Sequence, residues 1–540
     1  MAKFTVTEEF RASMGWLHTW AGVATSCLLF MIFWMGSLAV FDREIDQWMK
    51  PEMRVSAPAE KFSYGKVFDQ LRSGEAKDAT RIFVNAPSER EPLVYTFYAT
   101  PDGEFVRGQS DPATGEPIEL TDSHAGTGFY YPFHYSLHIP AGIGYWVVGF
   151  CAMAMLVLMV SGIFIHRKII KDFFTFRPKK ALRRSTLDLH NMSSLMALPL
   201  HILFPLTGLM IFFSIYLPWS PTVVFGGDED RQFAEAFAFA SVEPSGEPSP
   251  AEIDMDAIIA QVESNWALRS PGSVPKADAV GLELANDANA YAMVREVFPS
   301  RSVSMNKNIT AISVSDREVL SDVGTGPAKS TYAWLAGAHF IQFDSWALRW
   351  LYFAGGLLGS LMIASGLMFW MQARIRKGAV EPRSVRIVRG LAIGSISGII
   401  LASGVYLIAN RLIPVGSSGF GMGRANFEVL FFYLVWIGTF VHAAIRGKFA
   451  WREQSLAIVP TAIFAVLLNW VTTGHHPIAA YQAGLTQIWS MDLTLLGGAG
   501  MAWFAAVRLK VSDEEAASLK AELDRTEVDA LIPPEAMPAE

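Results

Sequence analysis

Cysteine is nearly absent from the sequence: Cys27 and Cys151 are the only two, and each lies inside an apolar run. No Cys-x-x-Cys or Cys-x-x-Cys-His motif occurs, which argues against disulfide exchange, thiolate-held iron–sulfur clusters and covalently attached haem. No glycine-rich dinucleotide fingerprint follows a strand-like stretch. A basic tract with interleaved aromatic residues is also missing, so nucleic acid is not expected as a partner.

Charged residues are scarce as well, at 18%, whereas 51% of the 540 residues are hydrophobic. This composition is typical of a multi-pass membrane protein rather than a soluble one. Apolar runs long enough to cross a lipid bilayer predict an all-α membrane bundle of about eight transmembrane helices, the first of them retained rather than removed as a signal peptide. Their approximate ranges are Trp16–Phe41, Ile143–Ile165, Leu195–Leu217, Trp346–Met371, Val388–Ile413, Val429–Ile445, Leu456–Val471 and Leu485–Val507.

Lysine and arginine are concentrated in the connections after the second, fourth and sixth of these helices. The positive-inside rule places such connections, and hence both chain termini, in the cytoplasm. Two long segments then lie on the outer face, and strand-like alternation in Leu93–Tyr98 and Tyr291–Val297 predicts that each forms a small α+β domain. The predicted organisation is a first helix (1–42), a first outer domain (43–135), the second and third helices with a basic cytoplasmic loop (136–217), a second outer domain (218–338), a fourth helix (339–375), a four-helix membrane extension (376–510) and a cytoplasmic tail (511–540).

The first four predicted helices look like two copies of one unit. The matching pairs are Leu17-His18 with Leu189-His190, Leu137-His138 with Ala338-His339, and Ser161-Gly162 with Ser365-Gly366. Paired units normally lie around a pseudo-twofold axis. His18 is therefore expected to face His190 near the inner surface, and His138 to face His339 near the outer surface.

Histidines at the ends of apolar segments are the candidate functional residues, because ionisable side chains are costly in a membrane. Two neutral imidazoles from separate helices can fill both axial positions of a haem iron, which favours electron transfer over oxygen binding. The inner pair would be His18 and His190, with His166 as a competing ligand. His201 lies deeper than His190 and could replace it, serve a third haem or bind a propionate.

The outer haem would be held by His138 and His339, with His134, one helical turn earlier, as the alternative ligand. Arg349 lies just inside the fourth helix, where a buried guanidinium needs an anion. A haem propionate and the Asp344 carboxylate are equally suitable partners for it. For each histidine taken alone, the competing interpretation is an interfacial side chain bonded to backbone or lipid.

The order and spacing of several short motifs resemble a known family. They are Trp16-Leu17-His18-Thr19-Trp20-Ala21-Gly22, Leu137-His138-Ile139-Pro140, Ser161-Gly162-Ile163-Phe164-Ile165-His166-Arg167-Lys168, Lys171-Asp172-Phe173-Phe174-Thr175-Phe176-Arg177-Pro178, Asp188-Leu189-His190-Asn191 and Leu198-Pro199-Leu200-His201. Over residues 10–375 the chain resembles the PepSY-associated transmembrane family of iron-regulated bacterial inner-membrane proteins, whose characterised members include ferric-siderophore reductases. The resemblance implies PepSY-like domains in the periplasm and haem b within the bundle. It does not extend to the last four helices.

These features favour an oxidoreductase that takes electrons from a cytoplasmic donor or from quinone and passes them through two haems to a ferric siderophore. Reduction would release the iron, because hard oxygen ligands hold ferrous iron more weakly than ferric iron. A transporter for iron or siderophore is the alternative, in which Asn469 and Asp492 of the last helices either mark a pore or pair with one another. A non-enzymatic PepSY regulator is a third possibility, but it leaves the histidines unexplained.

Overall fold

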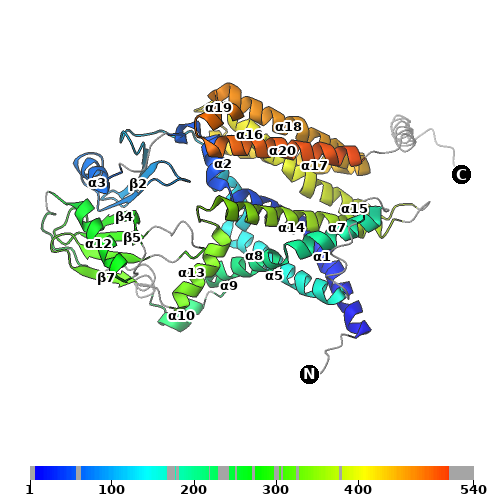
Figure 1. Ribbon diagram of the computed structural model, residues 1–540, viewed down its shortest axis with the longest axis horizontal. Helices are drawn as coiled ribbons and strands as arrows, with labels where there is room; N and C mark the ends of the chain where they lie inside the picture. Colours follow the sequence, from blue (N-terminus) through cyan, green and yellow to red (C-terminus); the bar gives the residue numbers. More distant parts are fainter. Residues whose placement is uncertain are drawn as a thin grey trace.

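The computed structural model describes residues 7–55, 62–166, 177, 182–217, 219–228, 242–249, 252–269, 274–296, 303–305, 308–323, 327–375 and 380–509. A bundle of long helices forms one part of the molecule, and a β-sheet flanked by two helices lies at one end of it (Figure 1). Helix α1 (Glu8–Ala39) begins, and helix α20 (Thr486–Arg508) ends, at the end of the bundle away from the sheet (Figure 1). We call these the sheet end and the far end of the bundle.

Six helices in the described part of the chain are long and apolar enough to cross a membrane, or seven if the bent pair α7–α8 counts as one span. The expected count of eight is therefore not confirmed. The run Arg424–Thr473, in which the sequence predicts two spans, is one of the six, and it contains α17, a short 3₁₀ turn and α18. The chain is a multi-pass membrane protein, and its apolar runs are helical because a helix satisfies its own backbone hydrogen bonds in lipid.

The remaining helices connect or extend these spans. Helix α7 (Leu182–Met196) is bent by 66° from α8 (Leu198–Ile211), where Pro199 occupies the first turn of α8. The other helical elements are α2 (Asp42–Met49), η1 (Pro51–Met53), η3 (Gly126–Tyr130), α4 (Tyr131–Ser136), α5 (Ala141–Ile165), α9 (Phe213–Tyr216), α10 (Ser220–Phe225), α13 (Pro327–Phe340), α14 (Trp346–Gln372), α15 (Arg383–Ile393), η4 (Gly394–Gly398), α16 (Ile399–Leu412), α17 (Arg424–Arg446), η5 (Gly447–Phe449), α18 (Ala450–Thr473) and α19 (Pro477–Gln482).

The two long segments that the sequence predicts to lie outside build one sheet, not the two separate domains that the sequence suggests. Seven antiparallel strands lie in the order β3-β2-β1-β4-β5-β6-β7, and β1 of the first segment pairs with β4 of the second, with Ile82 opposite Leu282. Helices α3 (Tyr64–Ser73) and α12 (Met255–Arg269) share a buried apolar cluster with one face of this sheet. The strands are β1 (Arg81–Asn85), β2 (Val94–Ala99), β3 (Phe105–Ser110), β4 (Ala277–Glu283), β5 (Tyr291–Glu296), β6 (Ile309–Ser313) and β7 (Val319–Val323), and a separate pair is β8 (Ser418–Gly419) with β9 (Met422–Gly423).

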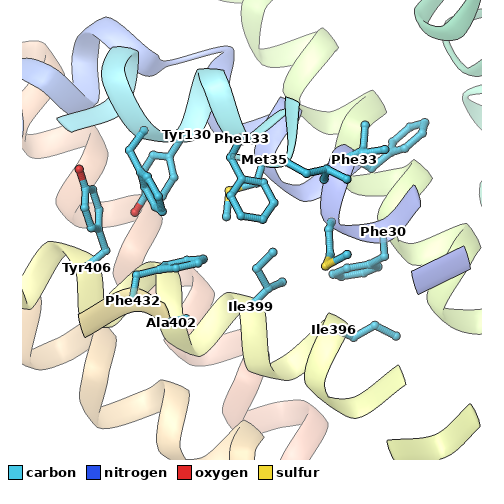
Figure 2. Close-up of a cluster of buried hydrophobic side chains, with 14 of the residues drawn as sticks. Phe30, Phe33, Met35, Tyr130, Phe133, Ile396, Ile399, Ala402, Tyr406 and Phe432 are labelled. Carbon is cyan, nitrogen blue, oxygen red and sulfur yellow. The ribbon is translucent and has the colours of Figure 1, made fainter. Parts of the chain in front are cut away.

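The C-terminal helices pack firmly against the first four spans. Figure 2 shows the apolar contact, in which side chains of α1, η3 and α4 meet those of η4, α16 and α17. The indole of Trp48 donates to the Asp492 carboxylate at 2.8 Å, and the Asn469 amide donates to the same carboxylate at 3.4 Å. Asn469 and Asp492 therefore pair with one another, which was one of the two predicted alternatives. The labelled residues of the apolar contact are Phe30, Phe33, Met35, Tyr130, Phe133, Ile396, Ile399, Ala402, Tyr406 and Phe432.

Candidate functional site

A cavity of about 370 Å³ lies between α1, α5, α7 and α14 in the half of the bundle toward the far end. We call it the far-end cavity. His18 of α1, His166 at the end of α5 and His190 of α7 all line it. The ring centres of His18 and His190 are 6.2 Å apart, and their planes are inclined by 77°. The structure thus brings together the two histidines that the repeat predicts to face one another.

Backbone carbonyls fix both rings in the same tautomer. Nδ1 of His18 lies 3.0 Å from the Leu158 carbonyl oxygen, and Nδ1 of His190 lies 2.7 Å from that of Met362. A carbonyl oxygen only accepts hydrogen bonds, so each Nδ1 carries the proton and donates it. Each Nε2 then keeps the lone pair that a metal requires, and this arrangement is the usual one for a metal-bound histidine.

Two glycines allow these rings to lie close to the neighbouring helices. A Cβ atom at Gly366 would lie 2.9 Å from Nδ1 of His190, and one at Gly162 would lie 3.3 Å from Cε1 of His18. Gly162 and Gly366 are the matched glycines of the repeat. A larger residue at either position would crowd an imidazole, which explains why both copies of the Ser-Gly motif have glycine there.

A second cavity, of about 120 Å³, lies toward the sheet end and contains another pair of histidines. We call it the sheet-end cavity. His134 of α4 and His339 of α13 line it, and their stacked rings have centres 5.9 Å apart. Nδ1 of His134 donates to the Ile32 carbonyl at 2.9 Å. Nδ1 of His339 donates to the Thr207 hydroxyl at 3.0 Å, because that hydroxyl uses its own hydrogen on the Leu203 carbonyl. Both Nε2 atoms therefore keep their lone pairs.

The glycine pattern is repeated at this pair. A Cβ atom at Gly36 of α1 would lie 2.6 Å from Nδ1 of His134, and one at Gly208 of α8 would lie 3.0 Å from Cε1 of His339. Gly36 follows His18 by the same number of residues as Gly208 follows His190. Each repeated unit therefore supplies one imidazole to the far-end cavity and one glycine to the sheet-end cavity. Sequence reasoning missed these two glycines, although their equal spacing from the histidines was a usable signal.

The expectation that His138 faces His339 is wrong. His138 lines neither cavity; its ring packs against Phe129, with ring centres 4.8 Å apart, and its Nε2 is buried without a partner among the described residues. The Leu-His motif suggested the wrong register. Leu137 and Ile341 both have a φ of 55°, so these turns correspond, and His134 is the residue that takes the position beside His339.

His201 lies outside both cavities, fully buried against Phe33. Its Nε2 lies 3.1 Å from the Gly355 carbonyl oxygen, so Nε2 carries the proton and Nδ1 is left without a partner in the described part of the chain. This is the opposite tautomer from that of His18, His190, His134 and His339. His201 therefore belongs neither to the His18–His190 pair nor to the His134–His339 pair.

Arg349 also has a different role from the one that its position suggests. Its guanidinium forms a buried ion pair with the Glu44 carboxylate of α2, and it reaches only the backbone oxygen of Asp344. Glu44 also accepts from Arg90, in the β1–β2 connection, at 2.9 Å. Arg349 lines neither cavity. The anion that balances its charge is the Glu44 carboxylate, which also links the sheet to the bundle through Arg90.

The two cavities adjoin, since Leu29 and Met155 line both. No group of three or more His, Cys, Asp or Glu side chains within the described ranges could hold a metal ion. A haem iron needs only two protein ligands. A metal–imidazole bond is about 2.0 Å long, and the ring centre lies roughly 1.1 Å beyond Nε2. Two imidazoles on opposite sides of one metal therefore have ring centres about 6 Å apart. Both observed separations match this value, so the donor sets fit bis-histidine haem.

Comparisons with known proteins agree with this architecture. The model of a family described as the PepSY-associated TM region matches residues 15–373, which include all five histidines that line the two cavities. An uncharacterized protein of Pseudomonas aeruginosa is 26% identical over 279 residues, which are 50% of this chain and 68% of that protein. This chain is similar to it, and its description assigns no activity.

Proposed function

We propose that this chain, which belongs to the PepSY-associated transmembrane family, is a haem b-containing oxidoreductase that passes electrons across the bacterial inner membrane to ferric siderophores. One observation carries the proposal. Two pairs of histidines lie in adjoining cavities at different depths of the bundle, and hydrogen bonds through Nδ1 leave all four Nε2 atoms free.

In this proposal His18 and His190 hold one iron, and His134 with His339 holds the other. A bis-imidazole haem supplies a one-electron couple that needs little rearrangement. The chain contributes the rest: the Leu158, Met362 and Ile32 carbonyls and the Thr207 hydroxyl orient the rings and make them better ligands. Leu29 and Met155 fill the space between the cavities with apolar groups, which keeps water out of the gap.

In this proposal, electrons flow toward the sheet end of the bundle. The sheet and the sheet-end cavity are at one end of the bundle, and we assign that end to the periplasm because the basic connections belong to the other. Both termini then face the cytoplasm. The electron donor is a cytoplasmic protein or quinone, and the acceptor is ferric iron in a siderophore, which binds ferrous iron weakly.

An iron or siderophore permease is the alternative, and it would use the C-terminal helices. Asn469 and Asp492 are the polar groups of those helices that the sequence singles out for such a path. They are fully buried, and they bond to one another and, through Asp492, to Trp48. The observation therefore favours a structural role for them over a pore.

Reoxidation of the reduced protein tests the proposal. Protein in lipid nanodiscs is reduced with dithionite, freed of excess reductant, and mixed with a ferric siderophore under argon. The Soret band should return to its oxidised position while a ferrous chelator captures iron. The same siderophore loaded with gallium, which accepts no electron under these conditions, is the matched control. A colourless preparation, or a reduced spectrum that persists with the ferric siderophore, would contradict the proposal.

A further inference from the structure

Besides His18 and His190, the proposed iron ligands, the far-end cavity is lined by polar groups that have no role yet. Trp370, near the end of α14, lines the cavity; it is 7% exposed, and its Nε1 has no partner among the described residues. A buried N–H group without an acceptor is costly, so a bound group that accepts from Nε1 would stabilise this arrangement.

Arg374 supplies a cation to the same cavity. Its guanidinium carbon lies 4.0 Å from the centre of the Trp370 ring, and Nη1 donates to the Trp370 carbonyl at 3.2 Å. No carboxylate in the described residues lies within ion-pair distance of this guanidinium. The contact with the end of α14 uses one donor of five, so most of the guanidinium stays free for an anion.

His166 extends this group across the repeat. It precedes Trp370 by 204 residues, the same interval that separates Leu158 from Met362 and Gly162 from Gly366. The two side chains therefore occupy equivalent positions of the two units, and both line the far-end cavity. Since Trp370 has no metal-binding atom, the shared position is better suited to donating a hydrogen bond than to holding iron.

The sheet-end cavity has no such group. Its lining includes no lysine or arginine, and its polar side chains are histidine, tyrosine and serine. Only the far-end cavity thus combines apolar walls with a cation and a spare N–H at one edge. A flat apolar molecule with carboxylates on one edge matches this distribution.

We infer that Arg374, Trp370 and His166 form a carboxylate-binding subsite that takes the propionates of the porphyrin in the far-end cavity and points them away from the sheet. This inference rests on the proposed function. The subsite fixes the orientation of the group, and the positive charge of Arg374 favours the reduced state of the iron because reduction lowers the positive charge beside it. The two haems should therefore differ in their response to loss of this cation.

Potentiometric titration of the purified full-length protein, together with haem transfer to apomyoglobin, tests the subsite. Arg374→Gln should lower one of the two midpoint potentials, leave the other unchanged and speed loss of one haem roughly tenfold. Trp370→Phe, which keeps the ring and removes the donor, should speed the same loss by a smaller factor. Arg386→Gln, which removes an exposed cation of α15, is the control and should change neither quantity.

His166→Gln separates this inference from the proposed function. A hydrogen-bonding role predicts that the variant still holds two haems. The subsite is overturned if His166→Gln loses one haem as fully as His190→Ala does, or if Arg374→Gln behaves like Arg386→Gln. A wild-type protein without haem would instead defeat the proposed function itself.

Discussion

His18 and His190 come from equivalent positions of two repeated units, and their ring centres lie 6.2 Å apart inside one cavity. Among the described residues neither imidazole pairs with a carboxylate, and each Nδ1 is bonded to the backbone of another helix. The pair therefore requires both units at once. Duplication of one helix–domain–helix unit explains how a pair of histidines comes to lie on the axis between the copies.

Removal of one histidine should remove one haem. His190→Ala is expected to lower the haem content from about two per chain to about one by emptying the far-end cavity, and His134→Ala should do the same at the sheet-end cavity. The measurement is the pyridine haemochrome assay, normalised to protein. His442→Ala is the control, because His442 pairs with Glu453 at 3.0 Å and lines neither cavity. Equal haem content in all three variants would show that these histidines are not ligands.

The glycines beside the rings give a second test that leaves every ligand in place. Gly36→Ala would put a Cβ atom 2.6 Å from the His134 ring, so the imidazole must move and the sheet-end haem should be lost. Gly366→Ala should act in the same way on the far-end haem. Gly497→Ala places its Cβ atom in open space and should bind haem normally. Absorbance spectra and haem content distinguish these outcomes, and normal haem binding by Gly36→Ala would show that the His134 ring does not hold the sheet-end haem.

The ion pairs around Glu44 should contribute to stability. Glu44→Gln leaves the Arg90 and Arg349 guanidinium groups buried without a full counter-charge, which costs about 3–5 kcal/mol for a buried pair. Glu91→Gln removes a carboxylate that pairs with Arg43 at the surface and should cost about 0–1 kcal/mol. Thermal unfolding in detergent compares the two variants. Similar melting temperatures for both would mean that the sheet is not held to the bundle through Glu44.

Stability should also depend on pH through Asp42, which begins α2. Burial raises the pKa of this carboxyl from 3.8 to about 6, against the attraction of Arg90. Because the pKa of Asp42 is higher in the folded state than in the unfolded state, protonation favours the folded state. This contribution to stability is complete below about pH 4 and is lost as the pH rises through 6. The loss amounts to at most roughly 3 kcal/mol of unfolding free energy. Asp42→Asn should flatten the melting temperature between pH 4 and 6. The exposed Asp102→Asn should leave the slope as it is in the wild type, and an unchanged slope in Asp42→Asn would refute the assignment.

Several features were predictable from the sequence because they are local or repeated. The apolar runs predict a multi-pass helical bundle, although not its number of spans, and the Leu-His pairs at His18 and His190 predict which imidazoles meet. The family that the motifs suggest is confirmed by the match over residues 15–373.

Other features depend on contacts that no local pattern shows. The pairing of β1 with β4 joins segments about 200 residues apart, so alternation alone suggests two domains. His138 was chosen over His134 because the motif is visible in the sequence whereas the left-handed turn at Leu137, which sets the register, is not. Glu44 as the partner of Arg349 is likewise a tertiary contact.

Electron paramagnetic resonance of the oxidised wild-type protein, combined with its haem content, tests the central claim most directly. We expect about two haem b groups per chain, both low-spin with two imidazole ligands, because each cavity contains a pair of imidazoles whose ring centres lie about 6 Å apart. A haem-free protein purified from haem-replete cells would contradict it. So would a single haem, or a high-spin signal from iron with one ligand.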